Sequence, residues 1–102
     1  MMVEKLQIEI PGQQIADFCG RHHIRKLSLF GSVLREDFGP DSDVDVLVEF
    51  EEGKIPGLAF FGMQEELSEL LGWPVDLNTV RCLSRYFADD VLAEAEPVYV
   101  AA

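Results

Sequence analysis

Two aspartates separated by one residue are the first feature of this sequence that could do chemistry. Asp43 and Asp45 open the stretch DVDVLVEF, in which apolar residues alternate with mainly acidic ones. This alternation predicts a strand, where side chains two residues apart share a face and their Cα atoms are about 7 Å apart. Two such carboxylates repel each other unless a cation lies between them, and oxygen ligands of this kind suit Mg²⁺ or Mn²⁺. The pair is therefore a candidate site for a divalent ion.

A glycine–serine turn precedes the aspartate pair, with ten residues between Ser32 and Asp43. The apolar run 27–30 ends at Gly31, where a glycine allows a sharp turn and the close approach of a ligand. Ser32 is a favoured N-cap for a helical turn through Arg35, and free N–H groups at such a helix start suit a phosphate. The turn and the carboxylate pair together describe a site for a metal-bound nucleotide.

In these residues the sequence resembles a known family. Gly31-Ser32, ten residues and Asp43-x-Asp45 are similar to the GSX10DXD signature of the DNA polymerase beta-like nucleotidyltransferases. The setting LFGSVLRED…SDVDVLVEF in so short a chain resembles the minimal nucleotidyltransferase (MNT) branch. The resemblance implies that ATP is the substrate, that Gly31-Ser32 cradles its β- and γ-phosphates, and that Asp43 and Asp45 hold two Mg²⁺ ions.

A third carboxylate is expected on a later strand. In the stretch VDLN, Val75 and Leu77 face one side of a strand and Asp76 faces the other. From the residues alone, Asp76 is either a further metal ligand or a solvent-facing residue of an edge strand. The family has an aspartate on such a strand, so the resemblance implies that Asp76 holds the ion nearest the nucleophile and accepts or orients its proton.

Arg35 follows the glycine–serine turn by one helical turn, near enough to a triphosphate to offer it a fork of donors. The alternative is an ion pair with Asp37 or Asp41. The family pattern has an arginine at this place, which implies a phosphate-binding role. The next residue is usually glycine in the family, however, and here it is Glu36.

The elements that must position these residues can be predicted from periodicity and capping. Helices are expected after Pro11, over 58–71 with Gly72 closing the helix, and from near Ser84 to before Pro97. Strands are expected at 27–30, 44–50 and 75–78, and residues 98–100 form a closing strand or pack against the sheet. We therefore expect an α/β (α+β) fold, a single polymerase beta-like nucleotidyltransferase domain over 1–102 with a small mixed sheet and helices mainly on one face.

Composition limits the classes of partner. The 102 residues include 19 acidic and 8 basic ones, a formal net charge of −11, which opposes binding to the phosphates of DNA or RNA. Cys19 and Cys82 lack metal-ligand spacing, and the adjacent His22 and His23 would diverge on a helix. The start lacks a basic and apolar leader and no apolar run approaches 18 residues, so a cytoplasmic protein without membrane attachment is expected.

The resemblance also implies a function. The MNT branch often supplies the antitoxin of a pair with a HEPN-domain toxin, so we expect a hetero-oligomer in which AMP passes from ATP to a tyrosine of a HEPN ribonuclease and silences it. One alternative is a non-catalytic antitoxin that masks its partner by binding alone, against which the intact motif residues count. The other is a transferase for a small molecule, which would need length for an acceptor-binding domain.

Overall fold

The computed structural model of the chain describes residues 8, 10–34, 38–39, 41–54, 57–79 and 88–101. Within these ranges the element order is α1 (Gly12–Arg21), β1 (Ile24–Phe30), η1 (Gly31–Leu34), β2 (Val44–Phe50), α2 (Ala59–Leu71), β3 (Val75–Asn78), α3 (Ala88–Glu94) and β4 (Glu96–Val100). The element η1 is a short 3₁₀ helix. None of the described helices combines the length and the apolar character that a membrane crossing requires.

The four strands form one mixed sheet in the order β3-β2-β1-β4. Strand β1 lies antiparallel to both β2 and β4, and β2 lies parallel to β3. A parallel pair needs a crossover connection, which α2 provides here. Of the two alternatives for residues 98–100, the closing strand is the correct one: these residues belong to β4, which forms an edge of the sheet beside β1.

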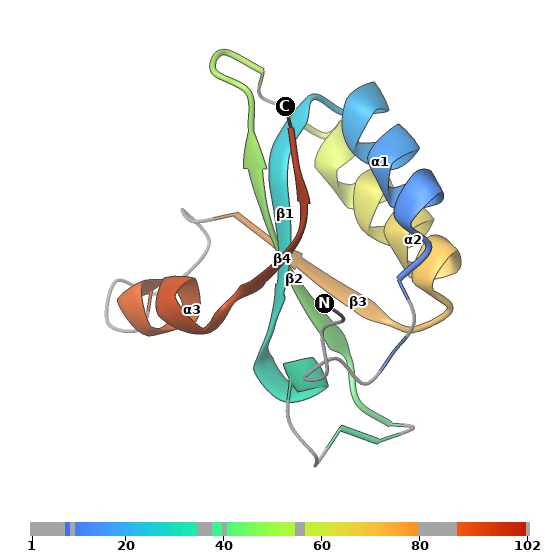
Figure 1. Ribbon diagram of the computed structural model, residues 1–102. Coiled ribbons are helices and arrows are strands. Elements are labelled where there is room, and N and C mark those ends of the chain that lie inside the picture. The colour runs from blue at the N-terminus through green and yellow to red at the C-terminus, as the bar shows by residue number, and fades with distance from the viewer. Residues whose placement is uncertain are drawn as a thin grey trace.

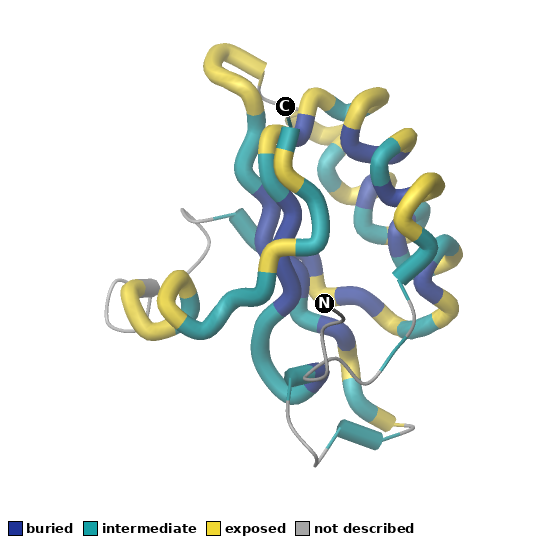
Figure 2. Tube along the Cα trace, viewed as in Figure 1, coloured by how far each residue is buried: buried dark blue, intermediate teal, exposed yellow. Residues whose placement is uncertain are grey.

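The core lies between the sheet and helices α1 and α2. Figure 1 shows these two helices on one side of the sheet and α3 on the other. In Figure 2 the buried segments gather where the sheet meets α1 and α2. Full burial of one large apolar side chain contributes about 1.5–3 kcal/mol, so this layer supplies most of the stabilisation. Its members include Ile15, Phe18, Cys19, Leu27, Leu29, Val46, Met63 and Leu67.

The predicted fold class is confirmed by this architecture. The helix predicted after Pro11 is present as α1, and its apolar residues Ile15, Phe18 and Cys19 are buried. Helix α2 ends at Gly72, whose φ of 75° is left-handed and suits a glycine. The start of the last helix was expected near Ser84, which lies outside the described residues, and the helix is seen from Ala88.

Strand β1 is longer than predicted, because it begins at Ile24 and not at Leu27. The extra residues pair with the far ends of both neighbouring strands. The carbonyl of His23 accepts a hydrogen bond from the Glu51 N–H at 2.9 Å, and the carbonyl of Arg25 accepts one from the Ala101 N–H at 2.8 Å. These hydrogen-bond partners are distant in sequence, so the local pattern around residues 24–26 does not predict that the strand begins there.

Candidate active site

The pairing of β2 with β3 places two of the predicted acidic residues side by side. Asp45 and Asp76 are direct partners in the parallel register. Neighbouring strands are about 4.8 Å apart, and residues paired in this way project from the same face. The residues flanking them along the strands are buried in the core, so both aspartates face away from α1 and α2; these flanking residues are Val44, Val46, Val75 and Leu77.

The glycine of the turn lies directly against one of these carboxylates. Phe30, the last residue of β1, is paired with Asp45, and Gly31 follows it with a φ of 80°. A Cβ atom added to Gly31 would overlap Oδ2 of Asp45 and would lie 3.1 Å from its Cγ. Gly31 is therefore required both by the backbone conformation and by the space that the carboxylate occupies.

Asp43 is exposed and comes directly before β2. The turn in front of it is closed at both ends, since the Gly39 N–H donates to Ser42 Oγ at 3.0 Å and the Ser42 N–H donates to the Gly39 carbonyl at 3.0 Å. Strand alternation places Asp43 on the same face as Asp45, about 7 Å away at Cα.

The predicted role of Ser32 as an N-cap is wrong. The 3₁₀ helix η1 begins at Gly31, so Ser32 lies inside it, half-buried. The positive φ of Gly31 makes the change of direction itself, so the chain enters the helical turn one residue earlier than expected. Arg35, the predicted phosphate-binding arginine, lies outside the described residues.

Gln64, which the sequence analysis did not single out, fixes the position of β3, the strand that carries Asp76. The side-chain oxygen Oε1 of Gln64 on α2 accepts a hydrogen bond from the backbone N–H of Leu77 at 2.9 Å. This bond joins the crossover helix to β3 one residue after Asp76. Gln64 stands beside Met63 and is followed by Glu65 and Glu66, so nothing in the sequence distinguished it from the exposed polar residues of the helix.

Asp43, Asp45 and Asp76 are the candidate ligands for a divalent ion. In the part of the chain that the structure describes, no three His, Cys, Asp or Glu side chains converge closely enough in this conformation to hold a metal ion. The backbone nevertheless brings Asp43, Asp45 and Asp76 to one end of two adjacent strands, with Asp45 and Asp76 paired directly across them. Hard carboxylate oxygens suit Mg²⁺ or Mn²⁺, and a glycine turn beside them suits the close approach of a nucleotide's phosphates.

Two other potential ligands, Cys19 and His22, are engaged elsewhere, and Cys82 lies outside the described residues. Burial raises the pKa of the Cys19 thiol to about 12, so this residue is neutral and inert at physiological pH. His22 Nε2 lies 3.0 Å from Glu66 Oε1, and its ring packs against Phe18 at a centroid distance of 4.7 Å. The predicted exclusion of a histidine metal site is consistent with these contacts.

Comparison with known proteins identifies the family. The profile of the nucleotidyltransferase domain matches residues 13–96, which include the glycine–serine turn and all three aspartates. The chain belongs to the nucleotidyltransferase domain family. It is 44% identical over 81 residues to the protein adenylyltransferase MntA of Thermococcus cleftensis, a match covering 78% of each chain. It is also 38% identical over 78 residues to a candidate protein adenylyltransferase of Methanocaldococcus jannaschii, covering 76% of this chain and 83% of that one.

Solved structures of nucleotidyltransferases share the fold. A candidate minimal nucleotidyltransferase is similar with a TM-score of 0.70 and 37% identity, covering 84% of this chain and 87% of that one. A toxin–antitoxin complex with AMP-PNP gives a TM-score of 0.71 at 19% identity, covering 90% of this chain and 75% of that one. A tri-AMPylated Shewanella oneidensis HEPN toxin in complex with its MNT antitoxin gives 0.63 at 20% identity, covering 88% and 70%. The predicted resemblance to the minimal nucleotidyltransferases is thereby confirmed, and the protein is a nucleotidyltransferase.

Proposed function

We propose that this nucleotidyltransferase is an antitoxin that transfers AMP from ATP to a tyrosine of a HEPN ribonuclease and thereby silences it. The observation that carries the proposal is the register of β2 and β3, which sets Asp45 beside Asp76 while Gly31 lies against the Asp45 carboxylate. One end of one sheet face thus offers a phosphate-suited turn and acidic oxygens together. The similarity to MntA of Thermococcus cleftensis supports the same reaction.

In this proposal the transfer is an in-line displacement at the α-phosphorus of ATP. The tyrosine oxygen forms a bond to that phosphorus, the bond to the bridging oxygen of the β-phosphate breaks, and pyrophosphate leaves. Asp76 accepts or orients the proton of the hydroxyl. Gly31 and Ser32 hold the β- and γ-phosphates, and Arg35 adds donors to them.

The proposed metal ligands are Asp43, Asp45 and Asp76. Bound divalent ions, two Mg²⁺ in this proposal, would neutralise charge on the triphosphate and stabilise the pyrophosphate as it departs. The fit of these ligands rests on the strand register and on the glycine that leaves room beside Asp45. The protein's own share is to fix the spacing of the oxygens and the position of the phosphates.

The acceptor in this proposal is another protein. The chain is similar to proteins named as protein adenylyltransferases, which supports a protein acceptor. A protein acceptor brings its own binding surface and must place its hydroxyl within about 3–3.5 Å of the phosphorus. A HEPN ribonuclease must also carry a basic surface for RNA, which the net charge of −11 would complement.

We expect a HEPN protein to be encoded next to the gene for this chain, and intact-mass spectrometry of that protein tests the proposal. With Mg-ATP and wild-type protein, we expect the partner to gain one or more AMP units on tyrosine, because the acidic site activates the transfer. The double variant Asp43→Asn/Asp45→Asn should fold and bind the partner but add no mass. A stable complex with an unmodified partner would instead support masking by binding alone, and the absence of any complex would favour a small-molecule acceptor.

A further inference from the structure

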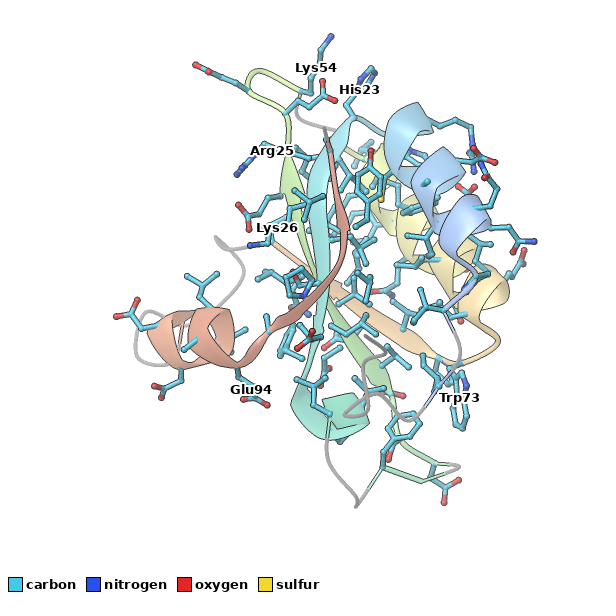
Figure 3. All side chains as sticks on the ribbon, viewed as in Figure 1. His23, Arg25, Lys26, Lys54, Trp73 and Glu94 are labelled. Carbon is cyan, nitrogen blue, oxygen red and sulfur yellow. The ribbon has the colours of Figure 1, made fainter. Side chains whose placement is uncertain are left out.

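An aromatic pair joins the two chain segments that lead to the acidic residues. Phe38 lies in the loop before Asp43, and Trp73 lies in the turn before Asp76. Their ring centroids are 4.8 Å apart with an angle of 56° between the planes, a favourable tilted arrangement. Both side chains are half-buried and pack against the core. Figure 3 shows Trp73 at the end of the molecule where β3 begins, far from Lys54 at the other end.

The tryptophan side of the pair is connected to the start of β2. Pro74 follows Trp73, and its carbonyl accepts a hydrogen bond from the Val44 N–H at 2.8 Å. Val44 is the residue between the two aspartates of the motif. The Trp73 carbonyl in turn accepts a hydrogen bond from Ser68 Oγ at 2.6 Å, which fixes the turn to α2.

The phenylalanine side is connected to the same place through the loop. Gly39 follows Phe38 and forms the two hydrogen bonds with Ser42 that close the turn, each 3.0 Å long. Ser42 directly precedes Asp43. Phe38 is therefore linked to Asp43 through this hydrogen-bonded turn, which spans the few residues between them.

We propose that the Phe38–Trp73 pair is a positioning element that sets the spacing between Asp43 and Asp76, and so sets the affinity of the site for a divalent ion with nucleotide. This inference rests on the proposed function for the assignment of both aspartates as ligands. Neighbouring carboxylates repel each other, and the loop that bears Asp43 would relieve that repulsion by moving away. The ring contact opposes the movement, so the ion meets ligands that are already close together.

The chain offers a matched control for this role. Phe60 is also half-buried and packed against the core, and it pairs with Phe61 at a centroid distance of 6.4 Å. It lies in the first turn of α2, about 18 Å along the helix from the end that leads to Trp73. Phe38→Leu and Phe60→Leu therefore make the same chemical change and each removes one aromatic pair, but only the first touches the proposed positioning element.

The test is a titration of Mg²⁺ against the melting temperature at a fixed concentration of a non-hydrolysable ATP analogue. We expect Phe38→Leu to raise the half-saturating Mg²⁺ concentration by about three- to tenfold, the effect of losing one aromatic pair from the bound state. Phe60→Leu should lower the melting temperature without changing that concentration. Trp73→Phe retains a ring and should behave like wild type, and Trp73→Leu should repeat the effect of Phe38→Leu.

Two results would overturn the inference. One is an equal Mg²⁺ requirement for Phe38→Leu and Phe60→Leu, since both rings would then contribute only to stability. The other is a wild-type protein whose melting temperature does not respond to Mg²⁺ with the analogue. Failure of the proposed function gives a different result from failure of this inference. In that case the partner would stay unmodified, but the Mg²⁺ titration of the wild type would still saturate.

Discussion

At the scale of single residues, the site depends on a glycine that leaves room for a carboxylate. Gly31 has a φ of 80°, and any β-carbon there would overlap Asp45 Oδ2. A larger residue would have to push away an oxygen that the proposed reaction needs. The requirement for glycine at position 31 thus has two causes, the left-handed backbone of the turn and the close contact with the Asp45 carboxylate.

Replacing this glycine should separate strain from function. Gly31→Ala is expected to lose about 1–2 kcal/mol of unfolding free energy through its left-handed backbone and to lose transfer activity by about 100-fold or more. Gly53→Ala is the matched control, because Gly53 has a φ of 79° but nothing lies within 4 Å of its added Cβ. It should lose similar stability and keep wild-type transfer. Denaturant unfolding and the AMP mass shift of the partner measure both effects, and full activity of Gly31→Ala would contradict this account.

The acidic residues were the part of the site most readable from sequence. The alternation of apolar and polar residues in 44–50 and 75–78 predicted which side chains turn away from the core, and the burial of Val75 and Leu77 confirms it for β3. That Asp45 and Asp76 are partners could not be read locally, because strand pairing joins residues about thirty positions apart. The contact of Phe38 with Trp73 was hidden for the same reason.

At the scale of elements, an ionic contact on the outer surface joins helices α1 and α2. Glu66 on α2 accepts a hydrogen bond from Arg21 and contacts His22 at the end of α1. The hydrogen bond from Arg21 lowers the pKa of Glu66, partial burial opposes this, and the His22 contact lowers it further. Most of the Arg21 side chain is exposed, so the stabilisation is small compared with that of the core.

The direction of this pKa shift predicts how acid acts on the helix pair. Because the pKa of Glu66 is lower in the folded state, its contribution to stability is present above the usual carboxyl pKa of about 4.3 and is lost as the pH falls through the lowered value. Wild-type protein should therefore lose more unfolding free energy between pH 7 and pH 3.5 than Glu66→Gln does. Glu69→Gln, an exposed change on the same helix, should behave like wild type. Equal pH dependence in urea unfolding for all three proteins would refute the prediction.

The elements themselves were predictable where local signals were strong. Gly72 in its left-handed conformation ends α2 where the sequence indicated. The early start of β1 at Ile24 was not predicted, since it depends on hydrogen bonds with chain positions beyond the second and fourth strands. The 3₁₀ geometry of η1 likewise follows from the abrupt turn at Gly31, which a capping rule for serine does not describe.

At the scale of the whole molecule, the two faces of the sheet have different tasks. One face is covered by α1 and α2 and provides the core, and α3 lies on the opposite side (Figure 1). Asp45 and Asp76 project from the face that turns away from α1 and α2. In the proposed function, a protein acceptor would reach the acidic residues from this second face. In the proposed function, the excess of acidic residues would attract a basic partner.

The most direct test of the account is to ask which phosphate of ATP reaches the partner and whether Asp76 is needed for it. Parallel reactions with ATP labelled at the α- or γ-phosphate would use wild type, Asp76→Asn and, as a surface control of equal charge change, Asp89→Asn on α3. Nucleotidyl transfer at a site that includes Asp76 predicts α-label on the HEPN partner with wild type and Asp89→Asn, none with Asp76→Asn, and no γ-label with any protein. Transfer of γ-label, or undiminished α-label with Asp76→Asn, would contradict it.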